Sequence, residues 1–73
     1  MYVLTIYTLP DDLHIEYQAA AADEYTLKVA AFKWMEDRGV DDMGIEEAWE
    51  YFREITLNGG PDDPRFVIRK ADR

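Results

Sequence analysis

The fold is decided by residues 45–57, which read IEEAWEYFREITL. The less polar side chains of this stretch recur three and four residues apart, a spacing typical of one face of an α-helix. They are Ile45, Ala48, Trp49, Phe52, Ile55 and Thr56. Glutamates and Arg53 occupy most of the remaining positions. The stretch therefore predicts an amphipathic helix that buries one face and exposes a charged one.

A second helix is predicted before it, over residues 23–38. Asp23 suits the N-cap position, because its carboxylate can accept a backbone N–H that the start of a helix leaves unpaired. Glu24 lies in the first turn, where the helix dipole favours negative charge. Gly39 follows at the position where a left-handed C-terminal cap is expected. The side chains expected to be buried are Leu27, Ala31, Trp34 and Met35, with Phe32 beside them.

Two strands joined by a short turn are predicted near the start of the chain. Residues 2–8 are rich in β-branched and aromatic side chains, and residues 13–19 alternate between apolar and polar ones. Residues 9–12 (LPDD) are a turn signal, because proline and aspartate both favour turns. Together they predict a β-hairpin. A last short strand is predicted within residues 65–70, after a loop over residues 58–64.

This order of elements predicts one α+β domain spanning residues 1–73. We expect a three-stranded antiparallel sheet in β-β-α-α-β order, with two helices packed on one face. A competing assignment starts a strand at residues 55–58, but the helical periodicity through Ile55 favours the helix.

The alternation of side chains assigns each strand residue to one of two faces. Those expected to face the helices are Leu4, Ile6, Ile15, Tyr17, Phe66 and Ile68. Those expected on the outer face are Val3, Thr5, Tyr7 and Val67. An apolar patch on an outer face is typical of an interface, so Val3, Tyr7 and Val67 form a possible second interface. Homodimerisation through this face or through a sheet edge would help to stabilise so small a domain.

The residue inventory argues against an enzyme. The chain has no cysteine and no serine, and His14 is its one histidine. His14 and Glu16 lie two residues apart on the predicted strand, so they are the remote candidates for an acid–base pair. A chain of 73 residues offers little room for a catalytic pocket. We therefore expect a binding protein without catalytic residues or a cofactor.

Metal sites and membrane segments are not expected either. The pairs Asp41-Asp42 and Asp62-Asp63 offer oxygen ligands, but the spacing of an EF-hand loop is not met. No apolar run approaches the roughly 20 residues that cross a bilayer. No secretory leader is recognised and cysteine is lacking, so the expected compartment is the cytoplasm.

Acidic residues are the main compositional feature. The chain has 16 Asp and Glu against 8 Lys and Arg, a net charge of −8. Residues 36–54 alone hold eight acids and two bases, a net −6. Glu46, Glu50 and Glu54 follow one another at four-residue spacing, where like charges repel. A surface designed only for solubility would place lysine at that spacing, so this face predicts recognition of a basic partner.

Direct binding of nucleic acid is not expected. Arg65, Arg69, Lys70 and Arg73 gather near the end of the chain, but the overall negative field opposes binding to a polyanion. The expected partner is instead a basic protein or nucleoprotein complex. The residues predicted to bind it are Asp41, Asp42, Glu46, Glu47, Glu50, Tyr51 and Glu54.

Small, acidic, cysteine-free α+β chains of this kind resemble phage-encoded inhibitors, including anti-CRISPR proteins and nucleic-acid mimics. The resemblance rests on size and charge, covers no defined motif and transfers no residue. It implies an inhibitor that occupies a nucleic-acid-binding surface. The alternative from a different class is a structural, self-associating module that uses the outer sheet face.

Overall fold

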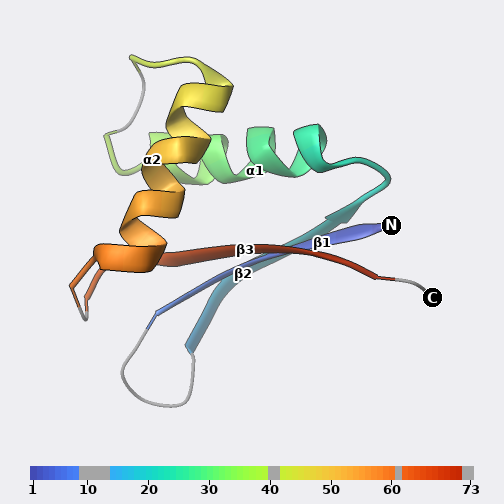
Figure 1. Cartoon of the computed structure of the whole chain (residues 1–73), viewed down its shortest axis with the longest axis horizontal. Coiled ribbons are helices and arrows are strands. Elements are labelled where there is room, and N and C mark those ends of the chain that lie inside the picture. Colours follow the sequence, from blue (N-terminus) through green and yellow to red (C-terminus); the bar gives the residue numbers. More distant parts are fainter. Residues whose placement is uncertain (9–13, 40–41, 61, 72–73) are drawn as a thin grey trace.

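The computed structural model describes residues 1–8, 14–39, 42–60 and 62–71. Its elements are β1 (Tyr2–Thr8), β2 (His14–Ala21), α1 (Glu24–Glu36), α2 (Ile45–Asn58) and β3 (Arg65–Lys70). The strands form one antiparallel sheet in the order β2-β1-β3. Both helices lie on the same side of this sheet (Figure 1). The α+β fold predicted from the sequence is therefore confirmed.

The core lies between the centre of the sheet and the two helices. β1 is the central strand, and its Leu4 and Ile6 are fully buried. The periodic stripes of both helices meet these residues, as their spacing predicted. The buried hydrophobic residues are Leu4, Ile6, Leu27, Ala31, Met35, Ala48, Trp49, Phe52 and Phe66.

Phe66 of β3 joins both helices to the sheet. Its ring stacks on Phe52 of α2, with centroids 4.7 Å apart. The rings of Trp34 from α1 and Trp49 from α2 meet it edge-on at 6.2 and 6.4 Å. Edge-to-face and offset pairs suit the quadrupoles of aromatic rings. The hydroxyl of Thr56 also accepts a hydrogen bond from the Phe66 backbone N–H at 2.9 Å, which ties α2 to the strand directly.

One strand assignment from the sequence is wrong because the hairpin contains a β-bulge. Ile6 lies opposite Tyr17, but the next residue, Tyr7, lies opposite Ile15, so Glu16 is the extra residue. An extra residue reverses the alternation beyond it. Ile15 therefore joins Tyr7 on the outer face instead of facing the helices, and it is 52% exposed. Tyr17 stays opposite Ile6 on the helix side but remains 36% exposed.

The ends of the helices follow the predicted signals closely. The Asp23 carboxylate accepts a hydrogen bond from the backbone N–H of Thr26 at 2.8 Å, and α1 starts at Glu24. Gly39, just beyond α1, has a φ of 95°, which is the left-handed region that glycine tolerates. α2 continues to Asn58, so the alternative strand at residues 55–58 is wrong.

Gly59 ends α2 at a point where the backbone leaves no room for a side chain. Its N–H donates to the Ile55 carbonyl at 2.8 Å. A Cβ at this position would lie 2.6 Å from the same carbonyl oxygen and 3.0 Å from Oδ2 of Asp63. The Arg65 guanidinium donates to the carbonyls of Gly59, Gly60 and Asp63, so the loop cannot easily move away.

We expect Gly59→Ala to lower the free energy of unfolding by about 1–3 kcal/mol, the usual cost of forcing atoms into a packed site. Gly60→Ala is the matched control, because a Cβ there would meet nothing closer than 3.8 Å. Thermal unfolding followed by circular dichroism measures both. Equal melting temperatures for the two variants would show that a Cβ at position 59 is accommodated beside the Ile55 carbonyl without loss of stability.

Candidate functional site

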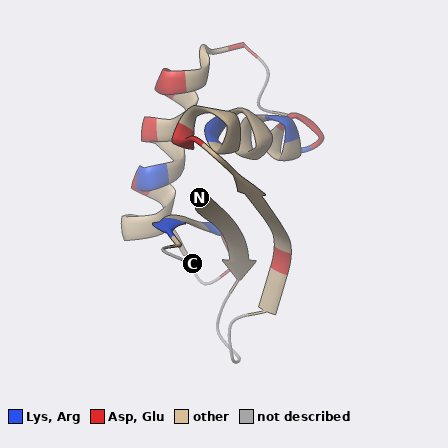
Figure 2. Ribbon diagram, turned by 90° about the vertical axis from the view of Figure 1, so that its right-hand side faces the viewer, with Lys and Arg blue, Asp and Glu red and all other residues tan. Residues whose placement is uncertain are grey.

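The outer face of α2 carries the acidic residues singled out by the sequence. Burial of Ala48, Trp49 and Phe52 fixes the opposite face of this helix against the core. The glutamates Glu46, Glu47, Glu50 and Glu54 are all exposed. Figure 2 shows acidic positions recurring along this helix, with one basic position among them. Tyr51 lies on the same helix and is 47% exposed, as an aromatic anchor for a partner requires.

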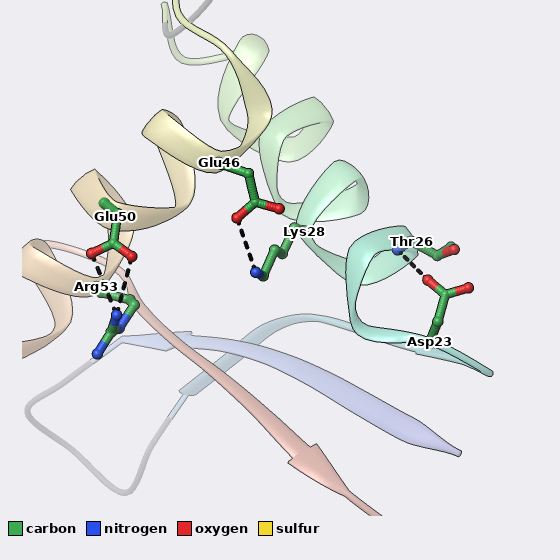
Figure 3. A network of polar contacts seen from close by, with 6 residues as sticks. All are labelled: Asp23, Thr26, Lys28, Glu46, Glu50 and Arg53. Carbon is green, nitrogen blue, oxygen red and sulfur yellow. Dashed lines mark hydrogen bonds and ion pairs between the residues drawn. The ribbon is translucent and has the colours of Figure 1, made fainter.

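Two of these four glutamates have basic partners within the molecule. The Lys28 ammonium of α1 lies 3.1 Å from the Glu46 carboxylate, so this pair bridges the two helices (Figure 3). The Arg53 guanidinium contacts both oxygens of Glu50, at 3.3 and 3.2 Å. The Glu50–Arg53 pair is exposed on both sides, and such pairs contribute little to stability. The Lys28 side chain of the other pair is only 21% exposed. Both pairs reduce the net charge of this face. The row of carboxylates formed by Glu46, Glu50 and Glu54 is therefore partly neutralised.

The other two glutamates have no basic partner among the described residues. Glu54 accepts a hydrogen bond from the Asn58 side-chain amide at 2.7 Å, which leaves its charge in place. Glu47 makes no ion pair or side-chain hydrogen bond with the residues that the structure describes. Asp42, also exposed, precedes the N-cap of α2 by two positions. Asp41, predicted to act with it, lies outside the described residues.

A groove of about 380 Å³ lies between α1, α2 and β3, next to this acidic face. It is lined by Glu24, Lys28, Trp49, Glu50, Arg53, Phe66, Val67 and Ile68. Lys28, Glu50 and Arg53, which belong to the two ion pairs drawn in Figure 3, are part of this lining. Sequence reasoning did not find Lys28, because nothing in local spacing links it to Glu46, eighteen positions away. Arg53 was detectable, since it follows Glu50 by three residues on one helix face.

The outer sheet face forms a second candidate surface. Val3, Tyr7 and Val67, predicted as a second interface, lie together around a shallow depression of about 370 Å³. Ile15 joins them through the bulge. The full lining is Val3, Thr5, Tyr7, Ile15, Gln18, Val67 and Arg69. No carboxylate belongs to this lining, so the described outer face differs in charge from the helical side of the molecule.

His14 and Glu16, the remote catalytic candidates, lie close together on exposed strand. His14 Nε2 is 3.6 Å from Glu16 Oε2, and the Thr8 hydroxyl donates to the same oxygen at 3.3 Å. The His14 side chain is largely exposed to solvent. This arrangement holds the bulge residue in place, and neither residue lines either of the two cavities described above.

Among the described residues, no group of three or more histidines and acids is placed to hold a metal ion. Within the same part of the chain, no helix has the length and hydrophobicity needed to cross a membrane.

Comparisons with protein-family models, with curated proteins and with solved structures find no match for this chain.

The pKa of the Asp23 carboxyl lies below its ordinary value of 3.8, mainly because the carboxylate accepts the Thr26 backbone N–H and then the Thr26 hydroxyl. A lowered pKa in the folded state stabilises the fold above the unfolded pKa, and this stabilisation is lost as the pH falls through the folded pKa. We expect Asp23→Asn to remove this pH dependence but to keep the cap, and Asp23→Ala to remove both.

Denaturant unfolding of the three proteins at pH 7 and at a pH of about 2 measures this difference. At pH 7 the order of stability should be wild type, then Asp23→Asn, then Asp23→Ala. At the lower pH the gap between wild type and Asp23→Asn should close. A gap that is independent of pH would rule out the charge of Asp23 as its source.

Proposed function

We propose that this protein is a small acidic binding protein that blocks a basic nucleic-acid-binding surface of another protein or nucleoprotein complex. The contact is made by the outer face of α2. One observation carries the proposal: four exposed glutamates and a half-exposed tyrosine share a helix whose opposite face is locked in the core.

The spacing of the carboxylates supports competition with a nucleic acid. Glu46, Glu50 and Glu54 are four residues apart, which is about 6 Å of helix rise. Two nucleotide steps along one strand measure about 7 Å. Carboxylates at this pitch can meet basic side chains that are arranged for phosphates. Both members of the Glu50–Arg53 salt bridge are exposed, so a basic partner can exchange with Arg53 at little cost.

Tyr51 and Leu57 supply apolar contact area, which contributes affinity that charged residues alone do not. Exposed charge pairs mainly set the association rate and orientation, whereas desolvated aromatic residues supply most of the affinity. Tyr51 and Leu57 are both exposed on α2. We assign Tyr51 the role of anchor and the glutamates around it the role of steering. This mode of action needs no catalytic residue and no cofactor, and a cytoplasmic protein without cysteines can carry it out.

The test is a charge reversal at Glu47 and Glu54, the two α2 glutamates that have no basic partner in the part of the chain that the structure describes. Immobilised wild-type protein should capture basic nucleic-acid-binding proteins from nuclease-treated lysate and release them as salt rises, because exposed charge contacts are screened. Glu47→Lys with Glu54→Lys should weaken the capture by about 10-fold or more, since like charges would then face each other. Added duplex DNA should compete with the wild-type protein for the same captured proteins.

The matched control is Glu36→Lys with Asp62→Lys, which changes two exposed acids away from α2. Both double variants raise the net charge from −8 to −4, since each reversal adds two. Equal loss of binding in both would mean that only total charge matters. No loss in the Glu47 and Glu54 variant would remove α2 as the binding face.

The second candidate is a self-associating structural module that stacks its outer sheet faces. The depression around Val3, Tyr7, Ile15 and Val67 favours it, because clustered apolar residues on a sheet face are typical of interfaces. The salt dependence of binding separates the two candidates. Capture through the acidic face of α2 weakens as salt rises, whereas association through apolar sheet faces does not. Val3→Lys should abolish association by stacking and leave capture through α2 unchanged.

A further inference from the structure

The three-stranded sheet has two outer edges, and they are protected very differently. β2 and β3 each pair only with β1, so each has one row of backbone groups turned away from the sheet. Such a row is a template for pairing with another strand. Natural proteins therefore cover sheet edges or place charges, prolines and bulges on them.

Two hydrogen bonds show which backbone groups of β3 point outward. The Phe66 N–H donates to the Thr56 hydroxyl of α2, so Phe66 is turned away from β1. The Ala71 N–H donates to the Met1 carbonyl at 2.7 Å, so Ala71 is turned toward β1. Along an antiparallel strand, successive residues turn their backbone N–H and C=O groups alternately toward and away from the neighbouring strand. Val67 and Arg69 therefore bond to β1. Phe66, Ile68 and Lys70 present their backbone groups at the outer edge.

The same alternation fixes the outward groups of β2. Val3 and Thr5 of β1 lie opposite Arg69 and Val67, so their backbone groups are used by β3. The intervening Tyr2, Leu4 and Ile6 must then bond to β2, where they lie opposite Ala21, Ala19 and Tyr17. The backbone groups of Gln18 and Ala20 therefore point away from the sheet. No hydrogen bond from the described residues reaches them outside the β1–β2 ladder.

β3 is protected at its edge and β2 is not. Thr56 occupies the outward N–H of Phe66, and three of the six residues of β3 are basic. On β2 the bulge and the charge of Glu16 lie at one end. The remainder, residues 17–22, reads YQAAAA and carries neither charge nor proline. The edge of β2 is thus a run of uncharged strand with outward N–H and C=O groups.

The lack of charge on this edge makes it suitable for a second copy of the chain. Two copies with a net charge of −8 repel each other least where carboxylates are absent, and residues 17–22 provide such a place. If Gln18 pairs with Ala20 of the second copy, Glu16 lies opposite Ala22, so no like charges face each other. Ile15 and Tyr17, the two large apolar side chains exposed on β2, then lie beside the junction.

We propose that two copies of this chain pair antiparallel through the edges of β2 to form a continuous six-stranded sheet. The twofold axis of such a pair is perpendicular to the sheet, so both helical layers lie on the same side. The dimer then presents two α2 helices in one direction. The pairing does not rest on the function proposed above.

Sedimentation velocity from about 5 to about 200 micromolar protein tests the pairing, because a dimer fraction rises with concentration by mass action. Ala20→Pro removes an outward N–H in each copy and no bond to β1. It should weaken association roughly 10- to 100-fold, the effect of losing two backbone hydrogen bonds. Lys70→Pro makes the same change at the outer edge of β3 and should leave association intact. Ala20→Lys, which keeps the N–H and adds an edge charge, should also weaken association.

Residue-specific amide hydrogen exchange distinguishes pairing through the edge of β2 from dimers formed through other surfaces. As concentration rises, exchange of the Gln18 and Ala20 amides should slow, while exchange of the Ile68 and Lys70 amides should not change. A monomer at every concentration in about 0.5 M salt, where charge repulsion is screened, would overturn the proposal. A dimer that leaves the Gln18 and Ala20 amides unprotected, or that responds equally to Ala20→Pro and Lys70→Pro, would also overturn it.

Discussion

The packing of Phe52 against Phe66 is the contact on which the rest of the molecule depends. The two rings stack at 4.7 Å, and Trp34 and Trp49 close around Phe66 edge-on. A single residue of β3 therefore sets the position of both helices. The hydrogen bonds between Thr56 and the backbone of Phe66 fix α2 along the strand. Because the apolar face of α2 is packed in the core, the glutamates on its opposite face point to solvent.

That constraint separates charge between the two sides of the protein. β1 and β3 contain no acidic residue, and β2 contains only Glu16. Twelve of the 16 acids lie within residues 23–63, on the helices or in the segments that flank them. On α2, Glu47 and Glu54 have no basic partner among the residues that the structure describes. The helical side is suited to a basic partner, and the sheet side is suited to an uncharged one. Both proposals follow from this division, the first from the helices and the second from the edge of β2.

Local patterns predicted most of the fold. The stripe from Ile45 to Thr56, the cap at Asp23 and the left-handed Gly39 each depend on nearby residues, and all three are present. The features that were not predicted depend on distant pairing. The bulge at Glu16 arises only when β2 meets β1, so alternation placed Ile15 on the wrong face. The Lys28–Glu46 bridge and the cap of Thr56 on Phe66 likewise require the folded arrangement of α1, α2 and β3.

The separation of charge is tested most directly by measuring the electrostatic potential near each amide in solution. Two paramagnetic probes of equal size, one cationic and one neutral, enhance amide proton relaxation according to their local concentration, and their ratio reports the local potential. Our account predicts that the cationic probe is most enriched near Glu47, Tyr51 and Glu54 and least enriched near Val3, Thr5 and Val67. A ratio that is uniform over the surface would contradict it, because the −8 charge would then be spread evenly and α2 would not be a distinct acidic face.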